Sequence, residues 1–155
     1  MIKYLLFKAK HLFSNFTFNQ KKETSNRLKD SFGKMKEASF DFDMIEKYFL
    51  KKDNSKAHQV LSNKTCADLD FDDLYMFIDR TYSKVGQQYL YNKLRTIKLD
   101  EQQTKLDEQI LNELSNDDKL RGSIQKKLEA LNHRDGYNIT TLFQDNHLES
   151  PKWFF

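Results

Sequence analysis

The sequence predicts an all-α fold, a helical bundle of about six to eight helices. Three observations predict it. Apolar residues recur at helical spacing along almost the whole chain. The 155 residues include only 4 Gly and 1 Pro, too few for a turn-rich fold, and no strand pair with a hairpin turn is recognisable in the sequence. With 13 Phe, 7 Tyr and 1 Trp, the chain carries more aromatic surface than a disordered coil would expose.

The first three helices are expected over residues 2–13, around residues 28–35, and from residue 41 or 43 onward. The second of these contains Gly33, which we expect the helix to tolerate. Asp41 or Asp43 is the expected cap of the third, because an aspartate accepts hydrogen bonds from the free N–H groups of a helix start. The apolar residues expected on the buried faces are Ile2, Leu5, Leu6, Ala9, Leu12 and Phe13, then Leu28, Phe32 and Met35, then Ile45, Tyr48 and Phe49.

The remaining helices are each expected to begin near a capping residue and to carry an apolar stripe. Short connections between the later helices favour antiparallel packing. The expected caps are Asp70, Ser83, Asp100 and Asn116. The expected stripes are Phe71, Leu74, Phe77 and Ile78, then Val85, Tyr89, Leu90, Leu94 and Ile97, then Leu106, Ile110, Leu111 and Leu114, then Leu120, Ile124, Leu128 and Leu131, and finally Ile139, Leu142 and Phe143 in a short last helix.

We expect three parts in the chain: a basic N-terminal helical segment, residues 1–66, a second helical domain, residues 67–150, and a truncation boundary at residues 151–155. The net charge of +3 is uneven, because it is +7 through Lys36 and −4 over the rest. A basic N-terminal stretch attracts nucleic acid or an anionic membrane surface, and it also suits a solvated lysine-rich surface. The aromatic C-terminal run either packs back onto the core or marks a chain cut at a boundary. In the second case, Trp beside Lys and Phe is typical of the edge of a membrane segment.

Motifs that carry catalytic or binding chemistry are mostly missing from the sequence. It contains no G-x-x-x-x-G-K-[ST] loop and no G-x-G-x-x-G turn for phosphates, and its four histidines are too scattered to grip a metal from one helix face. The single cysteine, Cys66, is expected as a buried thiol in a reducing, cytoplasmic compartment. The run Asp68–Asp72 imitates a calcium loop, but Asp73 stands where that loop needs glycine, so we expect a helix start. We expect no enzyme, metal or cofactor in this chain.

One short pattern resembles a known family. The residues that match the pattern identically are Asp79, Thr81, Gly86, Leu90 and Leu94, while Ser83, Val85 and Tyr89 stand for its second Thr, its Met and its first Leu. With these residues, the segment around Asp79 to Leu94 resembles the core, or lever, domain of the MutS family of DNA mismatch-repair ATPases. The likeness covers residues 68–135.

The residue types in this pattern also have physical roles of their own. Thr81 and Ser83 can satisfy backbone donors at the start of a helix. Gly86 has no side chain, so we expect another helix to approach closely there. Leu90 and Leu94 repeat one face of the helix one and two turns later.

The chain departs from the family pattern at several positions. Gln88 replaces its Arg, Lys93 replaces its Trp, and residues 95–97 replace the usual Pro-Leu. Leu106 lies near the position of the Arg that often opens the next helix. A Phe-x-Glu sequence, which forms the mismatch-reading wedge of the repair proteins, occurs nowhere in the chain. The likeness is therefore greatest to shortened MutS-like proteins, in which a helical N-terminal region leads to a C-terminal ATPase.

The resemblance implies a lever-like fragment with a structural, force-transmitting role. ATP and Mg²⁺ would bind a separate ATPase domain, and the implied partners are that domain, a second subunit of a full-length homodimer, DNA bound without sequence specificity, and a membrane reached through a downstream segment. The residues expected to contact the DNA backbone are Arg80, Lys84, Lys93 and Arg95. Two alternatives remain open: a helical protein–protein interaction module that presents residues 2–13 or 153–155 to a partner, and attachment of the first helix to anionic lipid.

Overall fold

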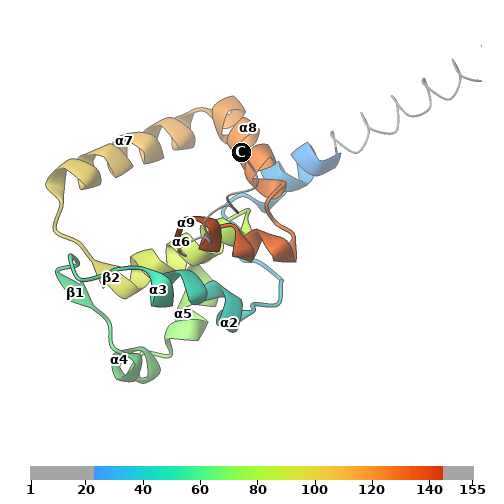
Figure 1. Ribbon diagram of the computed structural model, residues 1–155. Coiled ribbons are helices and arrows are strands. Elements are labelled where there is room, and N and C mark those ends of the chain that lie inside the picture. The colour runs from blue at the N-terminus through green and yellow to red at the C-terminus, as the bar shows by residue number, and fades with distance from the viewer. Residues whose placement is uncertain (1–22, 145–155) are drawn as a thin grey trace, which may run out of the picture.

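The computed structural model describes residues 23–144 of the chain, and the predicted first helix at residues 2–13 and the predicted boundary at residues 151–155 lie outside them. The elements are α2 (Phe42–Ile45), α3 (Lys47–Lys51), β1 (Gln59–Val60), α4 (Asn63–Asp68), α5 (Phe71–Ile78), α6 (Lys84–Arg95), β2 (Thr96–Ile97), α7 (Glu101–Asn116), α8 (Asp118–Glu129), the 3-10 helix η1 (Arg134–Asn138) and α9 (Thr141–Gln144) (Figure 1). The prediction of an all-α fold is confirmed.

The helix at residues 23–31 precedes α2 and ends earlier than expected. Gly33 takes a positive φ of 74°, a left-handed conformation that glycine adopts readily at a helix end. Gly33 therefore terminates this helix, and the expectation that the helix runs on to Met35 is wrong.

Helix α6 lies at the centre of the fold, against α2, α3 and η1. The buried apolar core consists of Ile45, Phe49, Cys66, Phe71, Tyr75, Tyr91 and Tyr137. Tyr91 of α6 meets the rings of Phe71 and Tyr75 edge-on, with centroid distances of 5.3 and 5.7 Å. Cys66 is a buried free thiol, as expected. This core joins residues on both sides of the boundary predicted at residue 66.

The buried face of α6 differs from the predicted apolar stripe. Its buried residues are Gln87, Gln88, Tyr91, Asn92 and Arg95. Tyr89 is 55% exposed, whereas Leu90 and Leu94 pack against the core from partly buried positions. The stripe predicted for α5 is also wrong beyond Phe71, because Tyr75 is buried one turn later and the other three residues are exposed: Leu74, Phe77 and Ile78.

Three of the predicted helix caps are confirmed. The side chains of Asp41, Ser83 and Asp100 each accept a hydrogen bond from a backbone N–H in the first turn of the following helix. Asp117, rather than the predicted Asn116, caps α8 by accepting from two N–H groups. Asp70 precedes α5 as expected, but it has a φ of 47° and makes no side-chain capping bond.

Backbone hydrogen bonds to distant segments hold both ends of α6. At its start, the N–H of Lys84 donates to the carbonyl of Leu131, at 3.1 Å. At its end, the N–H of Leu61 donates to the carbonyl of Arg95, at 2.9 Å, and β1 pairs with β2 directly beyond it. The position of α6 is therefore fixed by segments before and after it in the chain.

Helices α7 and α8 form an arm that stands over α6 (Figure 1). Helix α7 has no buried residue, and Gln125 is the one buried residue of α8. The apolar residues predicted to be buried here are largely exposed: Leu106, Ile110, Leu111, Leu120, Ile124 and Leu128. An ion pair between Lys93 of α6 and Asp107 of α7, at 2.5 Å, connects the arm to α6.

Candidate functional site

Four of the residues that carry the MutS resemblance, Asp79, Thr81, Ser83 and Gly86, lie in or beside the turn between α5 and α6. Helix α5 ends where the N–H of Asp79 donates to the carbonyl of Tyr75, at 2.8 Å. This turn places the side chain of Asp79 inside the protein, where it has no exposed surface. We call this group of residues around the Asp79 carboxylate the Asp79 node.

Three donors satisfy the buried carboxylate of Asp79. Lys36 Nζ lies 2.8 Å and Gln87 Nε2 2.9 Å from Oδ2, while the N–H of Thr81 lies 2.8 Å from Oδ1. Burial by itself would raise the pKa of the Asp79 carboxyl, but the hydrogen bonds from Lys36, Gln87 and Thr81 outweigh it and hold the pKa below 3.8. Asp79 is therefore a buried, charged and fully hydrogen-bonded anchor.

Lys36 comes from the connection before α2, far from α6 in the sequence. Besides Asp79, its ammonium donates to Oγ1 of Thr81, at 3.1 Å. Burial lowers the pKa of Lys36 in spite of the carboxylate, and the nearby charges of Lys84 and Arg80 lower it further. Nothing in the sequence marks Lys36 as the partner of Asp79, because the two are 43 residues apart.

Gln87 connects the Asp79 node to two tyrosines. Its Oε1 accepts from the hydroxyl of Tyr137, at 2.7 Å, and its backbone carbonyl accepts from the hydroxyl of Tyr75, at 2.9 Å. Burial, together with the charges of Asp41 and Asp79, raises the pKa of Tyr137 to about 12. Both hydroxyls therefore act as neutral donors that tie α5 and η1 to α6.

Gly86 makes room for the capping turn rather than for another helix. The hydroxyl of Ser83 accepts from the N–H of Gly86, at 3.0 Å. A Cβ on Gly86 would lie 2.9 Å from Ser83 Oγ and 3.2 Å from the Cβ of Thr81. These nearest atoms belong to the turn itself, which corrects the expectation of a close helix–helix approach.

Gln88, a departure from the family pattern, occupies a second buried polar position. Its Nε2 donates to the carbonyls of Met44, at 2.8 Å, and Tyr137, at 3.1 Å, and its Oε1 accepts from the hydroxyl of Thr140, at 2.9 Å. The amide therefore joins three segments of the chain. A glutamine in a helix usually indicates a solvated face, and the one sequence signal for this role was that the family pattern has a polar residue here.

Three of the four residues predicted to contact DNA lie at the surface or close to it, but all four take part in contacts within the protein. Arg80 donates to the carbonyls of Gly33, Phe77 and Asp79. Lys84 Nζ lies 3.3 Å from Gln87 Oε1 and 5.3 Å from the centre of the Tyr137 ring. Lys93 is paired with Asp107, and its side chain is 54% exposed.

Arg95, the fourth predicted DNA contact, is buried, with 4% of its surface exposed. Its guanidinium donates to the carbonyl of Leu61 at 2.9 Å, to Asn63 Oδ1 at 2.8 Å and to the Tyr91 hydroxyl at 3.1 Å, and it stacks 4.3 Å above the Phe49 ring. The expectation of a phosphate contact through Arg95 is wrong, because carbonyl oxygens and aromatic rings already surround its charge.

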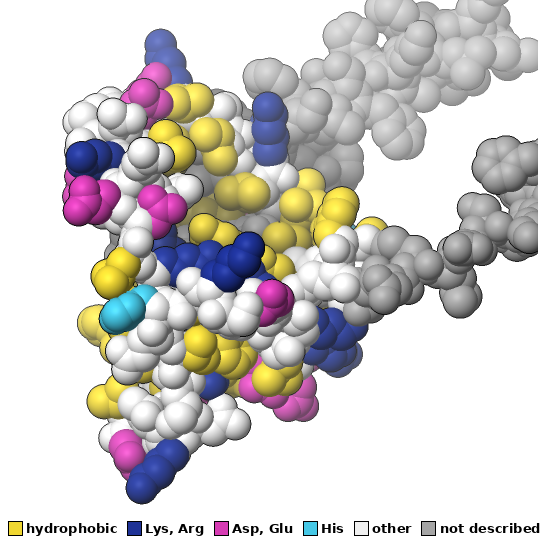
Figure 2. Space-filling model, turned by 60° about the vertical axis from the view of Figure 1, so that its left-hand side comes forward, with side chains coloured by type: hydrophobic (Ala, Val, Ile, Leu, Met, Phe, Trp, Pro, Cys, Tyr) yellow, Lys and Arg dark blue, Asp and Glu magenta, His cyan; other side chains and the backbone are white. Residues whose placement is uncertain are grey.

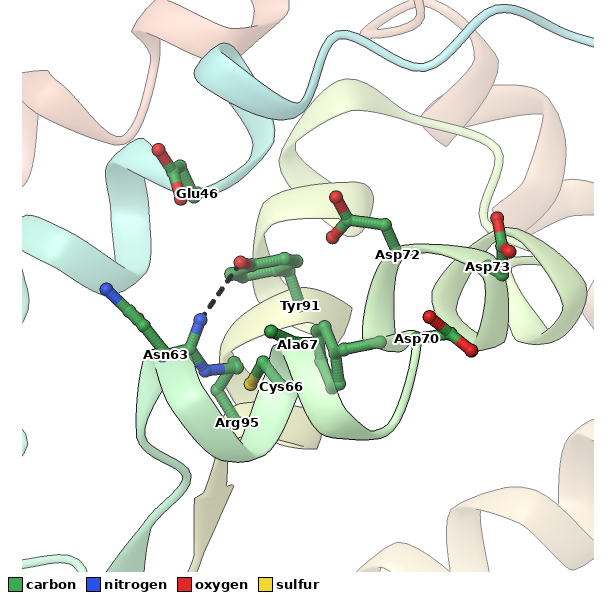
Figure 3. A pocket seen from close by; sticks show the side chains of 10 residues that line it. Glu46, Asn63, Cys66, Ala67, Asp70, Asp72, Asp73, Tyr91 and Arg95 are labelled. Carbon is green, nitrogen blue, oxygen red and sulfur yellow. Dashed lines mark hydrogen bonds between the residues drawn. The ribbon is translucent and has the colours of Figure 1, made fainter.

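A hollow of about 430 Å³ lies beside Arg95 (Figure 3). Glu46 and Asp72 lie above Tyr91 in this view, and Arg95 lies below it. Four carboxylates line the hollow: Glu46, Asp70, Asp72 and Asp73. None of the ion pairs found among residues 23–144 joins them to Arg95.

A larger hollow, of about 970 Å³, lies between the helix at residues 23–31 and the Asp79 node. Its cationic lining residues are Arg27, Lys34, Lys36, Arg80 and Lys84, and its acidic ones are Glu23, Asp30, Glu37 and Glu129. Because both signs of charge are present in similar number, this hollow is not a uniformly basic surface.

In the described part of the chain, no group of three or more His, Cys, Asp or Glu side chains is placed to hold a metal ion. No helix within residues 23–144 has the length and apolar character needed to cross a membrane. Comparisons with protein-family models, curated proteins and solved structures give no significant match.

Proposed function

We propose that the chain is the lever-like helical part of a MutS-like DNA mismatch-repair ATPase, in which it packs against and transmits movement to other domains. The observation that carries the proposal is the Asp79 node. Asp79 is its buried anion, Thr81 donates to Asp79, Ser83 caps α6, and Gly86 leaves space for that cap. Four residues of the family pattern thus serve one structural unit, which suits an element whose role is mechanical.

The path from this node to the arm is suited to transmission. Helix α6 begins at the node and carries Lys93 on its last turn, where the ion pair to Asp107 meets α7. The bond from Lys84 N–H to the Leu131 carbonyl joins the start of α6 to the segment after α8. A displacement of the arm therefore acts on α6 at two separate points. ATP and Mg²⁺ would bind in the ATPase domain of the larger protein.

Any DNA contact in this proposal goes through the phosphate backbone and uses Arg80, Lys84 and Lys93. The contacts described for Lys84 and Lys93 each use one of the three N–H groups of the ammonium, and Lys93 is also more than half exposed. Such contacts position a duplex without reading its sequence.

The exposed arm favours a second candidate, a helical protein–protein interaction module with no role in nucleic-acid binding. Large apolar side chains on both α7 and α8 remain in contact with solvent, for example Leu111 at 63% exposure. Contiguous exposed apolar surface often marks an interaction site.

Titration of a fluorescently labelled DNA duplex, followed by anisotropy, separates the two candidates. The lever proposal predicts weak binding that falls steeply between about 50 and 200 mM salt. Changing Arg80, Lys84 and Lys93 together to Gln should weaken binding and flatten the salt dependence. Changing three exposed lysines elsewhere, Lys56, Lys64 and Lys119, to Gln is the matched control. An absence of binding at low salt would remove the DNA contact and favour the interaction module.

A further inference from the structure

The underside of the arm carries an apolar surface that faces α6. The ion pair between Asp107 and Lys93 fixes which side of α7 faces α6. Ile110, Leu111 and Leu114 follow Asp107 at three, four and seven residues, so they lie on the same side of α7. Ile110 is 45% and Leu111 63% exposed.

Helix α8, which follows α7 in the arm, carries a second apolar stripe. Leu120, Ile124 and Leu128 recur every four residues and are 39%, 37% and 38% exposed. Tyr89, one turn before Lys93 on α6, is 55% exposed. Figure 2 shows a group of hydrophobic side chains in the upper part of this face, besides others lower down. We call the region lined by α6, α7 and α8 the arch.

We propose that residues 1–13 of this chain pack into the arch. Their apolar residues recur at helical spacing and would form one continuous face: Ile2, Leu5, Leu6, Ala9, Leu12 and Phe13. As a helix, 13 residues are about 20 Å long, close to the roughly 24 Å of α7. The segment therefore has the length and the apolar face to cover the underside of the arm.

The charges of residues 1–13 are complementary to those of α7, the acidic helix of the arch, whereas α6 and α8 carry an excess of basic residues. Residues 1–13 carry Lys3, Lys8 and Lys10 and no acidic residue. Helix α7 carries one basic residue, Lys105, and four acidic ones: Glu101, Asp107, Glu108 and Glu113. A basic amphipathic segment therefore gains favourable charge contacts along α7 as well as apolar contacts.

The chain is long enough to make this connection. The described residues begin beside the end of α8, where Arg27 forms an ion pair with Glu129. The nine residues 14–22 can span up to about 30 Å when extended. That reach exceeds the length of α8, about 18 Å, so residues 1–13 can extend along the arm.

Hydrogen exchange of the full chain, read by mass spectrometry, tests this inference. We expect residues 1–13 to be protected, and Ile110→Glu to abolish that protection by placing a charge on the apolar surface. Gln109→Glu, which adds the same charge at the neighbouring exposed position of α7, should leave protection intact. Equal protection in the two variants, or no protection of residues 1–13 in the unchanged chain, overturns the proposal.

A second pair of variants, placed in residues 1–13, tests the proposal even if Ile110→Glu disturbs the folding of α7. Leu5→Glu should expose the amides of α7 to exchange, and His11→Glu, on the opposite side of the N-terminal segment, should not. Light scattering of the same samples gives the molar mass. Protection that appears only with a dimeric mass identifies a second copy as the occupant. Protection of residues 1–13 that appears only on anionic lipid vesicles identifies the membrane surface as their partner, and either result overturns the proposal.

Discussion

The ammonium of Lys36 lies 2.8 Å from Oδ2 of Asp79, a carboxylate that has no exposed surface. The bond joins residues that are 43 positions apart. It ties the connection before α2 to the turn that begins α6. Because the carboxylate is buried and the ammonium is mostly buried, each depends on the other for its charge to be tolerated.

Removing the carboxylate should therefore destabilise the protein strongly. Asp79→Ala leaves the Lys36 ammonium without its counter-charge and takes the acceptor away from Gln87 Nε2 and the Thr81 N–H. We expect the free energy of unfolding in urea to fall by about 3 kcal/mol. Lys34→Met, at an exposed neighbour of Lys36, is the control and should change stability by less than about 0.5 kcal/mol. Similar effects of the two substitutions would contradict the role given to Asp79.

The stability contributed by Asp79 should depend on pH. Its pKa in the folded protein lies below 3.8, so the unfolded state binds the proton more readily. The contribution is then fully present above the unfolded pKa and is lost as the pH falls through the folded value. Asp79→Asn cannot titrate, so its difference in unfolding free energy from the wild type should shrink below pH 3.8. A difference that stays constant from neutral pH to acid would rule this out.

Gly86 and Gly122 should respond differently to alanine. A Cβ at Gly122 in α8 meets nothing within 4 Å, so Gly122→Ala should stabilise the protein by up to about 1 kcal/mol through helix propensity. At Gly86 the same gain is opposed by the clash with Ser83 Oγ, which weakens a cap worth about 1 kcal/mol. Thermal unfolding of both variants measures the difference, and equal stabilisation would show that the capping turn adjusts without penalty.

Gln88 should tolerate no apolar replacement of similar size. Gln88→Met keeps the volume but leaves the carbonyl of Met44 and the hydroxyl of Thr140 without the partners they now have. We expect a loss of about 1–3 kcal/mol in unfolding free energy. Gln109→Met, at an exposed position of α7, provides the comparison. If Gln88→Met proves as stable as the wild type, the buried amide is not needed to hold α6 in place.

Several helix starts could be predicted from the sequence because capping is local chemistry. Ser83 and Asp100 accept bonds from residues three positions ahead, a distance that the sequence itself displays. The shift from Asn116 to Asp117 at α8 is one position, and both residue types cap helices equally well. The prediction that the helix continues through Gly33 was wrong, because a glycine ends a helix only when it adopts a left-handed backbone conformation, which the sequence does not display.

Burial was much less predictable, for two physical reasons. In α6, the inward residues Gln87 and Gln88 are polar because their partners, such as Asp79 and Met44, lie on other segments. A prediction that takes the apolar side of a helix as its buried side therefore selects the wrong side of α6. In α7, the stripe itself is real, but Ile110 and Leu111 remain exposed among the described residues.

The β1–β2 pair escaped notice because its strands are two residues each and lie far apart in the sequence.

The polar inner face of α6 also sets the angle at which this helix can sit. A helix buried through methyl groups can turn slightly about its axis and repack, since dispersion forces have no preferred direction. Hydrogen bonds do have a preferred direction. The amide of Gln87 donates to Asp79 and accepts from Tyr137, and the amide of Gln88 donates to the carbonyls of Met44 and Tyr137. One inserted residue would swing these amides by about 100° around the helix. Insertions or deletions within α6 should therefore be far less tolerated than in α7, where no side chain is buried.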